Sequence, residues 1–218
     1  MFQFNLEKIM KYFFLFFLCM SSLTLTAQKV AEIEEPQHAF QLMGGISKDL
    51  IGVQDQGYSL GVAYQVYFPK RFILGVEVAT DQSSYQKLST IYSAKDRWDK
   101  FTGFSGAVRL GYQIVNRKYI DFSFSAMPQI YHRSHFIKTR DKETKEEETE
   151  IENTTFFSLP LLANRFEFNY KISPAHAVGF VFDVHLDFDT NIFGDVIASK
   201  AFMIGRAMLS YRFVLPNN

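Results

Sequence analysis

The segment from Ala177 to Asp189, AVGFVFDVHLDFD, alternates between apolar and mostly polar side chains. One set of alternate positions is wholly apolar and comprises Val178, Phe180, Phe182, Val184, Leu186 and Phe188. The other set is mostly polar, with Val181 as its exception. Successive side chains of a strand point to opposite faces, whereas a helix would distribute these residues around its circumference. The segment is therefore predicted to be a strand with one apolar and one polar face.

The same alternation recurs along the chain and predicts an antiparallel series of eight strands. They cover residues 40–47, 58–68, 72–79, 104–114, 120–131, 156–170, 177–189 and 203–213. The connections alternate in length, with tight turns near residues 69–71, 115–118 and 171–176, and long polar loops that include 81–100 and the charged segment 138–152. Up-and-down pairing then places every tight turn, together with the start of the first strand and the end of the last strand, at one end of the sheet.

The strand predicted at 156–170 changes phase within its length. Its apolar positions are Phe157, Leu159 and Leu161 at first, and Phe166, Phe168 and Tyr170 later. Pro160 lies inside the run and cannot donate a ladder hydrogen bond. We predict a β-bulge between Leu161 and Arg165 that resets the phase.

Two closed architectures with eight strands fit this pattern: a transmembrane barrel with its apolar face in lipid, and a soluble lipocalin-like periplasmic carrier with its apolar face around a ligand. The polar face is rich in small residues, which suit a narrow interior, and it carries charges of both signs, which can pair there. Both observations favour the transmembrane barrel. The predicted lumen charge network comprises Glu77, Arg109, Asp121, Asp183, His185, Asp187, Arg206 and Arg212.

Aromatic residues gather at the strand ends beside the tight turns, where a membrane interface would lie. The predicted interface set comprises Phe68, Phe72, Tyr112, Tyr119, Tyr170, Tyr211 and Phe213. The predicted fold class is therefore all-β: an eight-stranded antiparallel up-and-down transmembrane β-barrel.

The N-terminal region has the features of an export signal. Lys11 precedes an apolar run from Tyr12 to Met20, and small residues follow at Thr26–Ala27. The run is too short for a membrane-spanning helix, which needs roughly 20 residues. We expect a signal peptide at 1–27, a flexible lead-in at 28–38 and a barrel domain at 39–218, with Met10 as an alternative start to Met1.

Several short motifs resemble the PorT-type outer-membrane β-barrel family, within the wider class of small OmpA/OmpX-like barrels. They are QLMGG in the first strand, FSLPLL at 157–162 and LSYRF at 209–213. After the paired leucines the family usually has a basic–aromatic ending, where this chain has Ala163–Asn164. The resemblance implies insertion in the outer membrane, recognition of the closing strand by the barrel-insertion machinery, and for some members a part in protein secretion.

The sequence offers weak candidates for chemistry. Asp183, His185, Asp187 and Asp189 form a row on one face of a strand, but alternate residues lie nearly 7 Å apart, so a metal site would need neighbouring strands. A rim-active hydrolase could combine His185 with Ser134 or Ser199, or use His132 or His135, yet no G-x-S-x-G motif is present. The acidic tract 141–152 lacks the spacing of a calcium loop.

We therefore expect a monomeric outer-membrane barrel with a lumen filled by side chains. It would act as a structural or interaction protein through its outer loops, or as an accessory of an envelope or secretion complex. Its expected partners are membrane lipid, the insertion machinery and other envelope proteins. The balanced formal charge offers no case for nucleic acid, and we expect no cofactor, no metal and no enzymatic activity.

Overall fold

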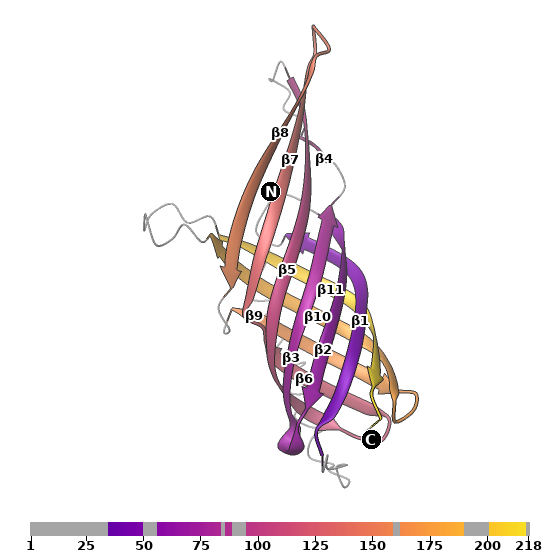
Figure 1. Ribbon diagram of the computed structural model, residues 1–218. Coiled ribbons are helices and arrows are strands. Elements are labelled where there is room, and N and C mark those ends of the chain that lie inside the picture. The colour runs from indigo at the N-terminus through magenta and orange to yellow at the C-terminus, as the bar shows by residue number, and fades with distance from the viewer. Residues whose placement is uncertain are drawn as a thin grey trace, which may run out of the picture.

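A computed structural model of the chain describes residues 35–49, 56–83, 86–88, 95–158, 162–189 and 201–216. The predicted signal peptide and most of the predicted lead-in lie outside these ranges. The described regular structure is one antiparallel sheet with a short 3-10 turn, η1 (Pro69–Arg71) (Figure 1). Its strands are β1 (Gln37–Asp49), β2 (Gln56–Tyr67), β3 (Phe72–Ser83), β4 (Gln86–Leu88), β5 (Lys95–Asn116), β6 (Ile120–Ala126), β7 (Gln129–Asp141), β8 (Glu147–Ser158), β9 (Ala163–Lys171), β10 (His176–Asp189) and β11 (Ala201–Val214).

Pairing of β11 with both β1 and β10 closes the sheet into a barrel. The ring runs β11-β1-β2-β3-β5-β6-β9-β10 and so contains eight strands, all antiparallel to their neighbours. Farther from the tight turns, β7 pairs with β5 in place of β6, and β8 reaches β10 in place of β9. The predicted fold class is confirmed: an eight-stranded antiparallel barrel.

Two of the predicted strands are each divided in two. Met127 and Pro128 separate β6 from β7, and a proline cannot supply the N–H that a continuous ladder needs. Ser158 at the end of β8 and Ala163 at the start of β9 are both fully buried, although strict alternation would place them on opposite faces. The expected change of phase is confirmed between Ser158 and Ala163, an interval that overlaps the predicted one; residues 159–161 lie outside the described part of the chain.

The apolar face points away from the barrel interior. Leu60, Val76 and Phe180 are 63%, 57% and 66% exposed, whereas the next residue on each strand, Gly61, Glu77 and Val181, is buried. An exterior of Val, Leu and Phe around a polar interior is the arrangement of barrels that cross membranes. The lipocalin-like alternative is wrong, because it requires the apolar face to line an internal cavity.

Side chains fill the barrel interior. Met43, Ala63, Val181 and Met208 form one apolar cluster inside it, and Tyr131, Phe156 and Ile204 form another. Gly103 makes room for Tyr131, because a Cβ at that glycine would lie 1.9 Å from the tyrosine hydroxyl oxygen. The interior also holds charged residues, which form the candidate site below.

The polar segments expected as long loops are in part strands. Asp81 to Ser83 continue β3, Lys95 to Lys100 begin β5, and the charged segment 138–152 forms the end of the β7–β8 hairpin. Together, residues 86–88, 95–101 and 135–152 form a sheet that continues past the closed ring, here called the outer extension (Figure 1). The loop prediction was wrong because strands were recognised by alternation of apolar and polar residues. That alternation occurs only where one side of a strand faces lipid or a core, which is not the case in the outer extension.

The tight turns and the described ends of the chain lie together at the opposite end. The Phe68 N–H donates to the Phe72 carbonyl at 2.8 Å across the β2–β3 turn. The Leu215 N–H donates to His38 at 2.7 Å, and the Val214 N–H donates to Ala175 at 2.7 Å. This arrangement agrees with the predicted alternation of connections. Among the described residues, no helix is long and apolar enough to cross a membrane.

A charge on the exterior of the ring should destabilise the protein, whereas one on the outer extension should not. We expect Val76→Arg to lower the free energy of unfolding in phospholipid vesicles by about 2–4 kcal/mol. Ile151 is 54% exposed on the outer extension, and Ile151→Arg is the matched control, with an expected change within about 0.5 kcal/mol. Equal effects in urea titrations of the two variants would contradict a lipid-facing exterior.

Candidate functional site

Arg165 on β9 connects three strands across the lumen. Its Nε and Nη2 donate to the two carboxylate oxygens of Asp183 on β10, both at 2.6 Å. Its Nη1 and Nη2 donate to Glu77 on β3, the latter at 2.9 Å. Strands β5 and β6 separate β3 from β9 in the ring, so this guanidinium joins nearly opposite walls. The planar fork of arginine suits two carboxylates at once, which a lysine could not match.

Two further arginines cross the lumen from β11. Arg206 holds both carboxylate oxygens of Asp81 on β3, at 2.5 and 3.1 Å. Arg212 donates to Asp121 on β6 at 2.5 Å and to the hydroxyl of Tyr67 on β2 at 2.9 Å. Each arginine is at most 4% exposed. Together with the Arg165 contacts, these pairs connect strands across the lumen at three positions along the barrel axis. Side chains therefore occupy the lumen.

Arg109 and Glu167 complete the buried network. The Arg109 Nη1 lies 2.8 Å from a carboxylate oxygen of Glu167, while Nε and Nη2 donate to Ser125 and Ser123 at 2.8 and 3.0 Å. Glu167 also accepts a hydrogen bond from the Asn169 amide at 2.6 Å. The small serines on β6 thus provide both the space and the acceptors for the guanidinium.

Of the predicted network residues, the structure places Glu77, Arg109, Asp121, Asp183, His185, Arg206 and Arg212 in the interior, all at most 4% exposed. His185 Nε2 lies 3.7 Å from Asp183. The backbone of Asp187 belongs to β10, and its side chain lies outside the described part.

Three central members of the network were missed from the sequence. Arg165 and Glu167 were hidden by the change of phase before β9, and Asp81 was assigned to a loop. Continuing the alternation of β3 by two residues would have found Asp81. Counting the phase of β9 backwards from Tyr170 would have found the other two.

The predicted interface aromatics lie on the outer surface near the tight turns. Phe72 and Tyr112 make an edge-to-face contact with ring centroids 5.6 Å apart. The hydroxyl of Tyr211 hydrogen-bonds the His176 ring at 2.6 Å, and Phe213 packs on the same imidazole. Tyr119 and Tyr170 are 54% and 52% exposed. Their position at a lipid interface stays a prediction.

The candidate catalytic groups are not brought together. His185 is fully buried in the interior, whereas Ser134 donates to Asn153 at 2.7 Å on the β7–β8 hairpin. His132 hydrogen-bonds Thr155 at 3.0 Å, and Ser199 lies outside the described residues. Within the part of the chain that the structure describes, no group of three or more His, Cys, Asp or Glu residues could hold a metal ion.

Charge pairs hold the strands of the outer extension together. Lys95 on β5 bonds Glu148 on β8 at 3.0 Å, and Lys138 on β7 bonds Glu147 on β8 at 2.7 Å. The hydrogen bond from Lys138 lowers the pKa of the Glu147 carboxyl, and the hydrogen bond to Glu148 raises the pKa of Lys95. Cross-strand pairs of opposite charge stabilise a sheet that has no apolar face.

A compact cluster occupies the base of the outer extension. The imidazole of His135 donates to Asp99 at 2.6 Å and stacks on Phe101 with centroids 4.2 Å apart. Arg97 also donates to Asp99, which raises the arginine's pKa, and the Arg133 guanidinium lies 3.7 Å from the Phe101 ring centroid. The cluster joins β5 to β7 where the ring ends and so fixes the direction of the extension.

Over most of its length, the far edge of β8 is not paired with any strand that the structure describes. Strand β8 pairs with β7 from Glu147 to Ser158, but with β10 only at Phe156 and Phe157. Among the described residues, no other strand pairs with Glu147–Glu152. The Asp141 N–H donates to the Glu146 carbonyl, and antiparallel alternation from that pair directs the backbone groups of Glu147, Thr149 and Ile151 towards the open edge.

Breaking the central ion pair on one side should be costly. Arg165→Met leaves Glu77 and Asp183 buried without their cation, so we expect a loss of roughly 3–5 kcal/mol in the free energy of unfolding. The combined variant Glu77→Gln, Arg165→Met and Asp183→Asn should recover most of that loss, because no charge then stays unpaired. Urea titration of both variants in vesicles tests this, and equal losses would count against it.

The turn of the β7–β8 hairpin should respond to acid. The carboxylate of Asp141 accepts hydrogen bonds from the N–H groups of Thr144 and Glu143 at 3.0 and 2.8 Å, which lower its pKa below the usual 3.8. Because the pKa is lower when folded, this contribution is present at neutral pH and is lost as the pH falls through that lowered value. The two amide proton shifts should therefore move together below about pH 4. In Asp141→Asn that transition should be absent, and its persistence would assign it to another group.

The comparisons with known proteins concern the fold alone. No protein-family model matches the chain, and no curated protein matches it in sequence. A major outer membrane protein from Thermus thermophilus is similar in structure, with a TM-score of 0.51 and 11% identity over 82% of this chain and 99% of that chain. Ail, the attachment invasion locus protein of Yersinia pestis, has a TM-score of 0.44 and 13% identity over 84% and 100%. OprG from Pseudomonas aeruginosa has a TM-score of 0.41 and 8% identity over 84% and 95%.

Three observations agree: the similarity in fold to the Thermus protein, and the apolar exterior and filled polar interior of this chain. A closed barrel satisfies its backbone groups internally, and an exterior of this kind is stable only in lipid. The chain has the fold of the small outer-membrane β-barrels, and it is a membrane-spanning barrel of the outer membrane.

Proposed function

We propose that the protein is an interaction protein of the outer membrane that binds an extended polypeptide segment by strand addition to β8. The observation that carries this proposal is the edge of β8 at Glu147–Glu152, which no described strand covers and which lies beyond the ring. Adding a strand to a sheet edge satisfies the edge backbone groups and is a recurring mode of peptide recognition.

The side chains along this edge define the partner's chemistry. Glu148, Glu150 and Glu152 lie on one face of β8, and Thr149 and Ile151 lie on the other. The side chains of an added strand would alternate in the same way, so one half would lie beside the glutamates and the other half beside Thr149 and Ile151. A segment with lysine or arginine on one face and β-branched residues on the other therefore fits this edge best.

The PorT-type resemblance adds a setting to this proposal. An accessory of a secretion or envelope complex would need a contact surface outside the membrane, and the outer extension offers one.

We also propose that the barrel works as a monomer in lipid and that β11, with Tyr211 and Phe213 near its end, is the strand recognised by the insertion machinery. We also propose a non-enzymatic role, because His185 is buried in the interior whereas Ser134 lies on the β7–β8 hairpin.

The test uses a synthetic peptide in which lysines alternate with threonine and valine, titrated against the barrel in nanodiscs. Ile151→Pro removes an N–H from the open edge while leaving the ladder to β7 through Glu150 and Glu152. We expect saturable binding that is lost in Ile151→Pro and kept in Ile151→Thr, which retains the N–H. Equal binding by both variants, or no binding by the unmodified barrel, would rule out strand addition.

A further inference from the structure

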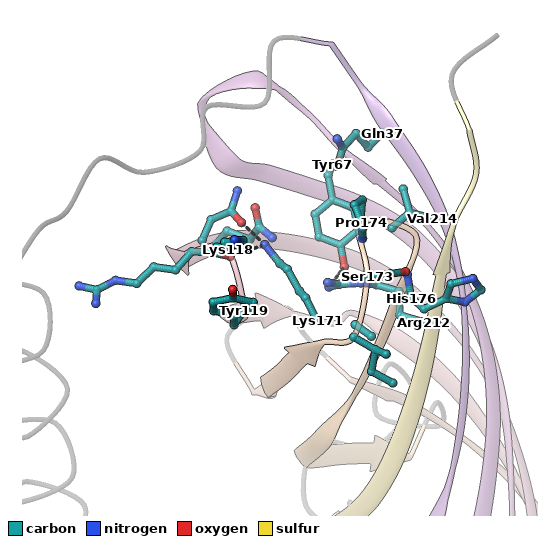
Figure 2. Close-up of a pocket in the computed structure, with 15 residues that line it drawn as sticks. Gln37, Tyr67, Lys118, Tyr119, Lys171, Ser173, Pro174, His176, Arg212 and Val214 are labelled. Atoms are coloured by element: carbon teal, nitrogen blue, oxygen red, sulfur yellow. Dashed lines mark hydrogen bonds between the residues drawn. The ribbon is translucent and has the colours of Figure 1, made fainter.

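A pocket of about 380 Å³ opens at the tight-turn end of the barrel, opposite the outer extension (Figure 2). It is lined from several directions, by the start of β1, the end of β2, the β5–β6 and β9–β10 turns and the end of β11. Its volume lies within the range typical of sites for small molecules. In outer-membrane barrels the short turns face the periplasm, so the pocket opens on that side.

The charged residues that line the pocket are all basic. The lining includes Arg117, Lys118, Lys171 and Arg212, together with His176, and it includes no aspartate or glutamate. The carboxylate behind it, Asp121, is held by Arg212 at 2.5 Å and lies 3.9 Å from Lys171. Arg212 is thus paired with a carboxylate like the other arginines of the interior, and Arg117, Lys118 and Lys171 are the further cations of the lining.

Two buried polar atoms of lining residues lack hydrogen-bond partners. Arg212 and Gln113 are 4% and 3% exposed, and the Arg212 Nε and the Gln113 Oε1 have no partner among the described residues. Buried polar groups in proteins are normally satisfied, so the orphaned Arg212 donor beside the pocket points to a ligand acceptor, whereas the Gln113 oxygen calls for a ligand donor. This observation is independent of the charge count.

Lys171 is positioned to meet such a ligand. Its ammonium donates to the Asn116 side chain at 2.5 Å and to the Arg117 carbonyl at 2.9 Å (Figure 2). These bonds use two of its three N–H groups and hold the side chain over the pocket. In Figure 2, Lys171, Tyr67 and Arg212 lie around the same space, although they come from β9, β2 and β11.

We propose that this pocket binds a phosphate group of a small periplasmic molecule or of a phospholipid headgroup. Cations that converge from separate strands suit a tetrahedral anion with several oxygens, and lysine binds phosphate as a point charge. Tyr119 and Ile172, 54% and 61% exposed beside the pocket, would contact the organic part of the ligand. The site is independent of the strand addition proposed for β8.

The experiment is isothermal titration calorimetry of the full barrel in a maltoside detergent, which contains no phosphate, with inorganic phosphate as the probe. We expect one saturable site whose affinity falls by about tenfold or more in Lys171→Gln, the loss of a hydrogen bond to a charged group. Lys70→Gln is the matched control, because Lys70 lies at the same end, in the β2–β3 turn, but outside the pocket lining.

A second variant keeps the test decisive if Lys171→Gln does not fold. Lys118 is exposed on the β5–β6 turn, so Lys118→Gln leaves the buried network intact and should weaken phosphate binding less strongly. Absence of saturable binding to the unmodified barrel, or equal weakening by Lys70→Gln, would overturn the proposal.

Two further titrants identify the source of the phosphate. Displacement of phosphate by dihexanoyl phosphatidic acid at lower concentration than by glycerol phosphate would support a lipid headgroup. The reverse order would support a soluble phosphate ester. Failure of both compounds to displace bound phosphate would overturn the assignment to a phosphate-bearing molecule.

Discussion

Closure of the backbone hydrogen-bond ladder is the constraint on which the rest of this structure depends. In lipid an unpaired N–H or C=O has no water to bind, so a sheet is stable there only as a ring. The pairing of β11 with β1 and β10 provides that ring. Closure also separates two environments, and each strand must then place apolar side chains outside and small or polar side chains inside.

The ring makes the interior a place where charges must find partners. A small barrel leaves no room for a water column, so each buried carboxylate needs a cation within reach. Arg165, Arg206 and Arg212 meet this need by reaching across the lumen, and Ser123 and Ser125 supply the remaining acceptors for Arg109. The network is thus an element of architecture, and the two proposed binding sites lie at the ends of the barrel.

The two ends differ in construction because their surroundings differ. Beyond the lipid, at the outer extension, strands are held by pairs such as Lys95–Glu148 and by the Asp99–His135 cluster, with an edge that no described strand covers. At the tight-turn end the chain is compact, and cations gather around a pocket whose lining lacks carboxylates. These differences underlie the two proposals, a polypeptide partner at the outer extension and a small anion at the tight-turn end.

The sequence by itself determined the strand series, the direction of each face and most of the buried charges. The reason is that residues facing lipid and residues facing the lumen alternate along each strand, and the two sets differ in polarity. Glu77, Asp183 and Arg206 could be assigned inward on that basis. It could not reveal the outer extension, since strands in water on both sides carry no apolar period. Arg165 and Glu167 lie beyond the change of phase, and they are assigned inward only when the alternation is counted backwards from Tyr170. Only the tertiary structure decided that Arg165 meets Glu77 and that Arg206 meets Asp81, because these partners lie on non-adjacent strands that face each other only after the ring has closed.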